Sequence, residues 1–140
     1  MYRKSEKKLR KRRKGEKILI RVISKKKINA LIRADFSCEI DGNHASFVSK
    51  STLKTYMEPH HLIPIEYWRS FDNSLDVEAN IVCLCSNCHN QIHYGLDSED
   101  LIRKLYDKRK EELRQVGIPI SLKQLLEVYA GVYRKKGTEE

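Results

Sequence analysis

The chain has 140 residues, 40% of them apolar and 34% charged, a composition typical of one globular domain. Lysine and arginine outnumber aspartate and glutamate by 28 to 19, which gives a formal net charge of +9. No apolar run approaches the roughly 18 residues that cross a bilayer, and no secretory signal begins the chain. We therefore expect neither a membrane-spanning nor an exported protein, and we expect a cytoplasmic location.

The positive charge is concentrated at the N-terminus. Ten of the 28 basic residues but only two of the 19 acidic residues lie in residues 1–17, so the rest of the chain is nearly neutral. Such a density of like charge, with little apolar surface, favours a flexible basic arm over a packed helix. We expect the densest cluster of the arm to contact nucleic-acid phosphates; it consists of Lys11, Arg12, Arg13 and Lys14.

The next two segments differ in their apolar pattern. Residues 18–35 are expected to be a helical lead-in, because their apolar side chains recur at helical spacing. Residues 36–95 are the expected core. They begin with turn formers and continue with a strand-like run at 55–68 that Pro59 and Pro64 interrupt. A second apolar run at 81–84 returns alongside it. This order predicts a two-stranded hairpin.

The remainder of the chain is helical in pattern. A short helix is expected from Ser86 to about Tyr94. Residues 96–140 form a helical extension that packs on the core, with one helix that stops at Gly117 and another that starts with a capping box at Ser121. The sequence thus predicts an α+β fold in which helices flank a small hairpin.

Four histidines have the spacing of a catalytic metal site. His89 and His93 lie one turn apart on the expected short helix, so both imidazoles can bind one cation. His60 and His61 are neighbours on a strand and therefore point to opposite sides. One of this pair can join the helical histidines on a metal, while the other acts as a general base. Glu58 shares a side with His60 and either orients a ligand or is merely solvated.

The cysteines indicate a structural metal site. Cys85 and Cys88 form a CxxC motif, a spacing that lets two thiolates bind one tetrahedral zinc ion, and the flanking sequence lacks the βαβ pattern of a redox CxxC. The favoured set is Cys38, His44, Cys85 and Cys88. Asp41 is the alternative to the histidine, although oxygen is a rarer zinc ligand. Cys83 is either a substitute ligand or a buried apolar thiol.

Three segments in a fixed order carry a family resemblance: EPHHLIP at 58–64, LDVEAN at 75–80 and LCSNCHNQIH at 84–93. Over about residues 36–95 the chain resembles HNH endonucleases of the McrA-like, zinc-bearing branch. The resemblance implies a ββα-metal fold with a structural zinc site. It also implies metal-dependent hydrolysis of DNA phosphodiester bonds in a restriction-like reaction, which can be modification-dependent.

The resemblance also implies roles for individual residues. His61 matches the general base, His60 and His89 match metal ligands, and His93 matches an additional ligand of some members. Asn80 matches the residue that pins the hairpin loop and so holds the base. The expected catalytic group is His61, Asn80 and Glu58. The catalytic cation would be Mn²⁺, Ni²⁺, Co²⁺, Mg²⁺ or Zn²⁺, and imidazole ligands favour the transition metals over Mg²⁺.

The implied partner is double-stranded DNA, which would place the protein on the nucleoid when it is bound. One HNH site cuts one strand, so a double-strand break requires a homodimer or two independent nicks. Sequence or modification specificity would come from a separate domain or from a partner. A different class of function stays open, namely a zinc-stabilised nucleic-acid-binding module whose nuclease site is inactive.

Overall fold

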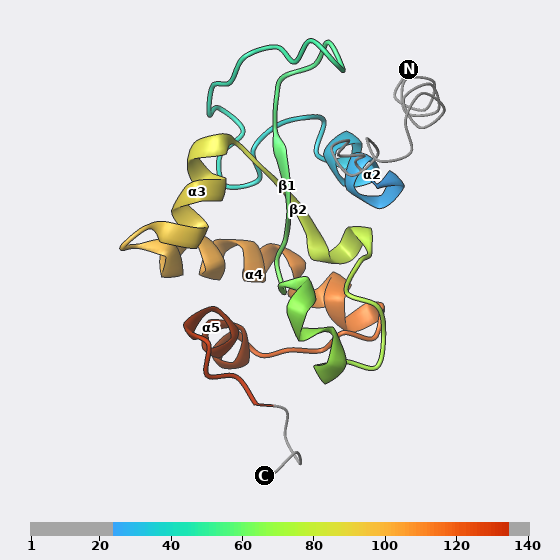
Figure 1. The fold of residues 1–140 in the computed structure, drawn as a ribbon, viewed down its shortest axis with the longest axis vertical. Helices are drawn as coiled ribbons and strands as arrows, with labels where there is room; N and C mark the ends of the chain where they lie inside the picture. Colours follow the sequence, from blue (N-terminus) through green and yellow to red (C-terminus); the bar gives the residue numbers. More distant parts are fainter. Residues whose placement is uncertain (1–23, 135–140) are drawn as a thin grey trace, which may run out of the picture.

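A two-stranded antiparallel sheet lies at the centre of the structure, a computed structural model that describes residues 24–134 (Figure 1). Strand β1 (Glu58–His61) pairs with β2 (Ile81–Leu84), and His60 lies opposite Val82. Every residue of β2 is buried, whereas β1 buries only His60. The hairpin expected from the sequence is present, and it joins a site-bearing strand to a core strand.

Four α-helices surround this sheet in the described part of the chain: α2 (Lys25–Arg33), α3 (Ser86–Tyr94), α4 (Ser98–Gln115) and α5 (Leu122–Ala130). Two short 3₁₀ helices, η2 (Ile65–Ser70) and η3 (Glu78–Asn80), lie in the connection between the strands. Side-chain caps explain where helices begin. Ser24 accepts the Lys27 N–H at α2, and Ser121 with Gln124 forms the predicted capping box of α5.

Two glycines follow helices for different physical reasons. Gly117, just after α4, has φ +80°, a left-handed conformation that glycine adopts without strain. Gly95, just after α3, is instead extended, with φ −75°. A Cβ atom at Gly95 would lie 2.7 Å from the carbonyl oxygen of Gln91. The end of α3 therefore requires glycine for space rather than for a positive φ.

The hydrophobic core lies between the sheet and the helices. Its fully buried side chains come from both sides of the hairpin and from the helices; they include Leu62, Ile63, Ile81, Leu84, Ile92, Leu105, Leu113 and Leu125. Helix α2 packs against both strands, and the long helix α4 contacts α3, η3 and α5 (Figure 1). This small α+β architecture confirms the expected fold class. No helix within residues 24–134 is long and apolar enough to span a membrane.

The expected segments fall partly outside the described residues. The basic arm, residues 1–17 with its cluster at 11–14, lies wholly outside them. Of the lead-in at 18–35, the structure describes residues from 24 onward, which form α2. Helices α4 and α5 lie within the expected extension at 96–140. The boundaries between these segments stay predictions.

Candidate active site

Three histidines converge beside the sheet, one from β1 and two from α3. A ring nitrogen of each of His60, His89 and His93 lies within 4.8 Å of one from the other two. Helical spacing puts His89 and His93 on one face of α3, with ring centroids 5.1 Å apart. His60 reaches that face from the strand, and its centroid lies 4.9 Å from that of His93. The structure thus gathers the three expected ligands in a set that suits a divalent transition metal.

The surroundings of His60 and His93 favour the neutral form of their imidazoles. His60 is 6% exposed. Burial lowers its pKa to about 3, aided by the neighbouring His89, His93 and His61. Burial and His89 also lower the pKa of His93. Because neutral imidazole is the form that binds a cation, His60 and His93 are in the required state at neutral pH.

Glu58 holds one of the ligands in place. Its Oε1 lies 2.6 Å from His89 Nδ1, and its Oε2 accepts hydrogen bonds from the hydroxyls of Tyr56 and Ser86, each at 2.9 Å. Burial opposes ionisation, but these hydrogen bonds lower the pKa of Glu58. The carboxylate therefore accepts Nδ1–H and leaves Nε2 of His89 for a metal. Glu58 therefore fixes the His89 ring and is not merely solvated.

Tyr129 on α5 plays the same part for His60. Its hydroxyl donates to the carbonyl oxygen of Leu62 at 2.6 Å, and it lies 2.8 Å from His60 Nε2. Because the Tyr129 hydroxyl donates its proton to Leu62, the hydroxyl oxygen accepts Nε2–H of His60. Nδ1 of His60 is then free. Burial raises the pKa of Tyr129, so the hydroxyl stays protonated. The sequence around Tyr129 predicts only a scaffold helix, and its position carries no sign of this contact.

His61 has a carboxylate partner of its own. Its Nε2 lies 3.0 Å from Asp76 Oδ1. The His61 side chain is 15% exposed and that of Asp76 41%, so the pair is reachable from solvent. An imidazole held through one nitrogen presents the other as a proton acceptor. Asp76 was not among the site residues expected from the sequence, although it lies within the LDVEAN segment.

Asn80 fixes the loops on which this pair stands. It is completely buried. Its Oδ1 accepts the N–H of Ile63 at 2.9 Å, and its Nδ2 donates to the carbonyl oxygens of Ile63 and Leu75 at 3.0 and 2.9 Å. These bonds join the segment after His61 to the segment before Asp76. This is the pinning geometry that the resemblance implies for Asn80.

A second cluster lies at the N-terminus of α3. Its ligand atoms lie within 4.8 Å of one another and come from Cys38, His44, Cys85 and Cys88. His44 Nδ1 lies 3.6 Å from Cys85 Sγ and 3.4 Å from Cys88 Sγ. Asp41, the alternative, is not in this group: its Oδ2 lies 3.9 Å from His44 Nε2, on the other side of the ring. A structural metal such as zinc fits this Cys₃His donor set.

The thiols of this cluster also favour a cation. Against the effect of burial, backbone hydrogen bonds, chiefly from Cys85, lower the pKa of Cys38 to about 7. Burial and the two neighbouring thiols raise the pKa of Cys88. A second thiolate beside the first is unfavourable until a metal binds both. Cys83 lies outside the cluster, and burial raises its pKa to about 12, so it is a buried apolar thiol.

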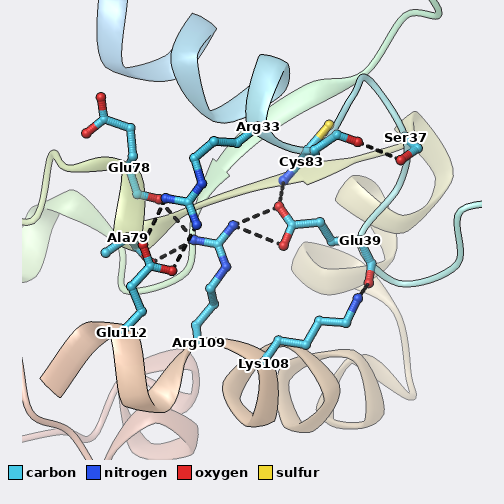
Figure 2. A network of polar contacts seen from close by, with 10 residues as sticks. Arg33, Ser37, Glu39, Glu78, Ala79, Cys83, Lys108, Arg109 and Glu112 are labelled. Carbon is cyan, nitrogen blue, oxygen red and sulfur yellow. Dashed lines mark hydrogen bonds and ion pairs between the residues drawn. The ribbon is translucent and has the colours of Figure 1, made fainter. Parts of the chain in front are cut away.

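A buried ion pair connects this cluster to the hairpin (Figure 2). Arg109 of α4 is 5% exposed and donates to both carboxylate oxygens of Glu39, at 3.0 and 2.8 Å. It also donates to the carbonyl oxygens of Glu78 and Ala79 in η3, at 2.9 and 2.8 Å. Glu39 exchanges hydrogen bonds with the backbone of Cys83 and so extends the pairing along β2. The Arg109 guanidinium thus links Glu39, which follows Cys38 of the cysteine cluster, to η3, which precedes β2.

The central part of the chain is similar to known proteins. Residues 38–95 match the sequence model of the HNH endonuclease family. The Type IV methyl-directed restriction enzyme EcoKMcrA of Escherichia coli (strain K12) is 36% identical to the chain over 69 residues. That alignment covers 49% of this chain and 23% of the relative, so the chain spans less than a quarter of the relative's length. The family match includes both the histidine and the cysteine clusters.

Proposed function

We propose that this chain hydrolyses phosphodiester bonds of double-stranded DNA in a metal-dependent reaction. The proposal is supported by the match of residues 38–95 to the HNH endonuclease family and by the similarity to the McrA restriction enzyme. The observation that carries the proposal is the convergence of the His60, His89 and His93 nitrogens within 4.8 Å. The carboxylate-paired His61 on the same strand adds a base. A ligand set and a base that are both intact favour catalysis over an inactive binding module.

The three imidazoles would hold the divalent cation. When bound, such a cation neutralises charge on the phosphate and stabilises the leaving oxygen. The protein keeps the ligands in the right tautomers, through Glu58 at His89 and through Tyr129 at His60. Imidazole ligands favour Mn²⁺, Ni²⁺, Co²⁺ and Zn²⁺ over Mg²⁺.

His61 acts as the general base in this proposal: it takes a proton from the water that attacks the phosphorus. Asp76 accepts Nε2–H of His61, which leaves Nδ1 as the proton acceptor. The same carboxylate stabilises the imidazolium that forms after proton transfer. Asn80 keeps the two loops together during the step. Cleavage would leave a 5′-phosphate and a 3′-hydroxyl, as the family resemblance implies.

The assignment of the base is tested by chemical rescue. His61→Ala should slow nicking by roughly 10²- to 10⁴-fold, while DNA affinity stays unchanged. Added imidazoles should restore part of the rate, and the restored rate should rise with the pKa of the added base, because the free base replaces the missing side chain. An unchanged rate in His61→Ala, or rescue that does not depend on the pKa of the base, would overturn the assignment.

Strand specificity and site selection are part of the proposal. Each chain carries one such centre among its described residues, so nicked circles should accumulate before linear DNA unless two chains act as a homodimer. The relative is described as methyl-directed. We propose that selection of modified DNA, where it occurs, comes from a separate domain or a partner. Equal cleavage of methylated and unmethylated plasmids would support this, and a strong preference would contradict it.

A further inference from the structure

A short hairpin lies in the chain between His44 of the cysteine cluster and the start of β1. We call residues 47–56 the tip hairpin. Val48 and Thr55 form an antiparallel bridge, and the N–H of Ser49 donates to the carbonyl oxygen of Lys54 at 2.8 Å, which closes the turn. In Figure 1 this segment lies at one end of the molecule, beyond the strands and far from α5. Its position leaves the turn free to reach a partner.

The tip hairpin is tied to the histidine cluster. The ring of Phe47 stacks on that of Tyr56, with centroids 4.7 Å apart and planes 12° apart. The hydroxyl of Tyr56 donates to Glu58 Oε2 at 2.9 Å, and Glu58 orients His89. A partner bound at the tip is therefore held at a defined position relative to the three imidazoles.

The apolar side chains of the tip hairpin are largely exposed. Phe47, Val48 and Leu53 are 63%, 66% and 75% exposed. Leu53 also has φ +62°, a left-handed conformation that favours glycine or asparagine and disfavours leucine. Neither core packing nor turn geometry accounts for a leucine there. Exposed apolar residues on a strained turn indicate a contact with something outside the domain.

The composition around these side chains indicates what that partner is. Residues 45–55 contain two lysines, five serines and threonines, and no acidic residue. Lys50 and Lys54 are exposed, and neither has an ion-pair partner among residues 24–134. Lysines and hydroxyls are the groups that contact phosphate and sugar. Apolar side chains beside them are typical of wedges that enter the minor groove.

We propose that the tip hairpin is a DNA contact in which Leu53, Phe47 and Val48 enter the minor groove while Lys50 and Lys54 bind the flanking phosphates. The inference rests on the proposed function, because it assumes that the substrate is duplex DNA. The inference also specifies how the substrate is positioned. The apolar wedge would hold the duplex at a set distance from the histidine cluster. Contact with bases by wedging is tolerant of sequence, so the tip hairpin supplies affinity and position.

The test measures binding of a fluorescent duplex by anisotropy, with the zinc-loaded 140-residue chain in a His61→Ala background that prevents cleavage. Leu53→Gly removes the wedge side chain at the turn and relaxes the left-handed conformation, so the variant should melt no lower than its parent. It should bind DNA about tenfold more weakly, equivalent to about 1.4 kcal/mol. Its salt dependence should be unchanged, since the substitution removes no charge. Val132→Ser, an exposed apolar residue beyond α5, is the matched control and should bind like the parent.

The lysines give a second, independent readout. Replacing Lys50 and Lys54 with glutamine should reduce the slope of log K against log salt by about 0.9 for each phosphate that the protein no longer neutralises. Parental affinity in Leu53→Gly would overturn the inference. So would a dimer that Leu53→Gly dissociates while DNA binding is unchanged, because the tip would then be a protein interface.

Different results would contradict the proposed nuclease function and the proposed DNA contact of the tip hairpin. If the protein without the His61 substitution neither binds nor nicks DNA, the proposed function fails. If that protein binds and nicks DNA while Leu53→Gly binds like its parent, only the role of the tip hairpin is wrong.

Discussion

Replacing Arg109 with methionine should destabilise the domain by about 3 to 5 kcal/mol, the cost of leaving one member of a buried ion pair alone. The guanidinium is 5% exposed and makes four hydrogen bonds of 2.8 to 3.0 Å, to Glu39 and to two carbonyls of η3. Most of the destabilisation comes from Glu39, whose side chain is 14% exposed and would keep a charge with no cation beside it.

The assay is urea unfolding of the zinc-loaded protein followed by circular dichroism. Arg103→Met is the matched control, because the residue is an exposed arginine of the same helix, α4. The control should change the free energy of unfolding by no more than about 0.5 kcal/mol. A destabilisation by Arg109→Met that is no larger than that by Arg103→Met would refute the reasoning.

A double-mutant cycle separates the charge from the hydrogen bonds. Glu39→Gln removes the charge but keeps an amide oxygen that can accept the N–H of Cys83. The double variant with Arg109→Met should lose less stability than the two single variants added together, because neither partner is left as an unpaired buried charge. Additive effects would show that the two side chains act independently.

Four further outcomes are expected. Cys85→Ala should release zinc and abolish the native circular dichroism spectrum, because apparent zinc-binding energies of about 10 to 16 kcal/mol exceed or match the stability of most domains; a native spectrum and melting temperature would contradict this. Asn80→Ala should cost about 3 kcal/mol in urea unfolding, since it leaves buried backbone groups unpaired. Asp76→Asn should slow nicking by about 10²-fold at unchanged DNA affinity, whereas the exposed Asp107→Asn should not, and equal rates would remove Asp76 from the mechanism. Deletion of residues 1–14 should weaken DNA binding and flatten its salt dependence, and an unchanged slope would rule the arm out as a contact.

The hairpin, the helix α3 and the two clusters could be predicted because their signals are local. The i,i+4 histidines and the CxxC motif lie on one short element, so spacing alone places their side chains together. The choice between His44 and Asp41 depended on how a loop folds back toward α3. Local patterns do not fix that path, and the structure was needed to show which side chain faces the thiols.

The residues that spacing could not reveal act across long separations. Tyr129 reaches His60 from a helix 69 positions later in the chain, and Asp76 reaches His61 across 15 positions. The packing of α5 beside the hairpin brings Tyr129 to His60. The fold of the connection between the two strands brings Asp76 to His61. Arg109 did carry a signal, because it lies midway between Leu105 and Leu113 at helical spacing on the buried face of α4. A charged residue on such a face indicates a buried partner.

Plasmid relaxation by metal-depleted protein tests the central claim most directly. The zinc-loaded protein, freed of other cations, is titrated with Mn²⁺, Mg²⁺, Ni²⁺, Co²⁺ and Zn²⁺ beside His61→Ala and His89→Ala. We expect nicking that requires an added cation and is abolished in both variants. Supercoiled DNA that stays intact under every cation, while the same protein still retards DNA in a gel, would contradict the nuclease and favour the binding module.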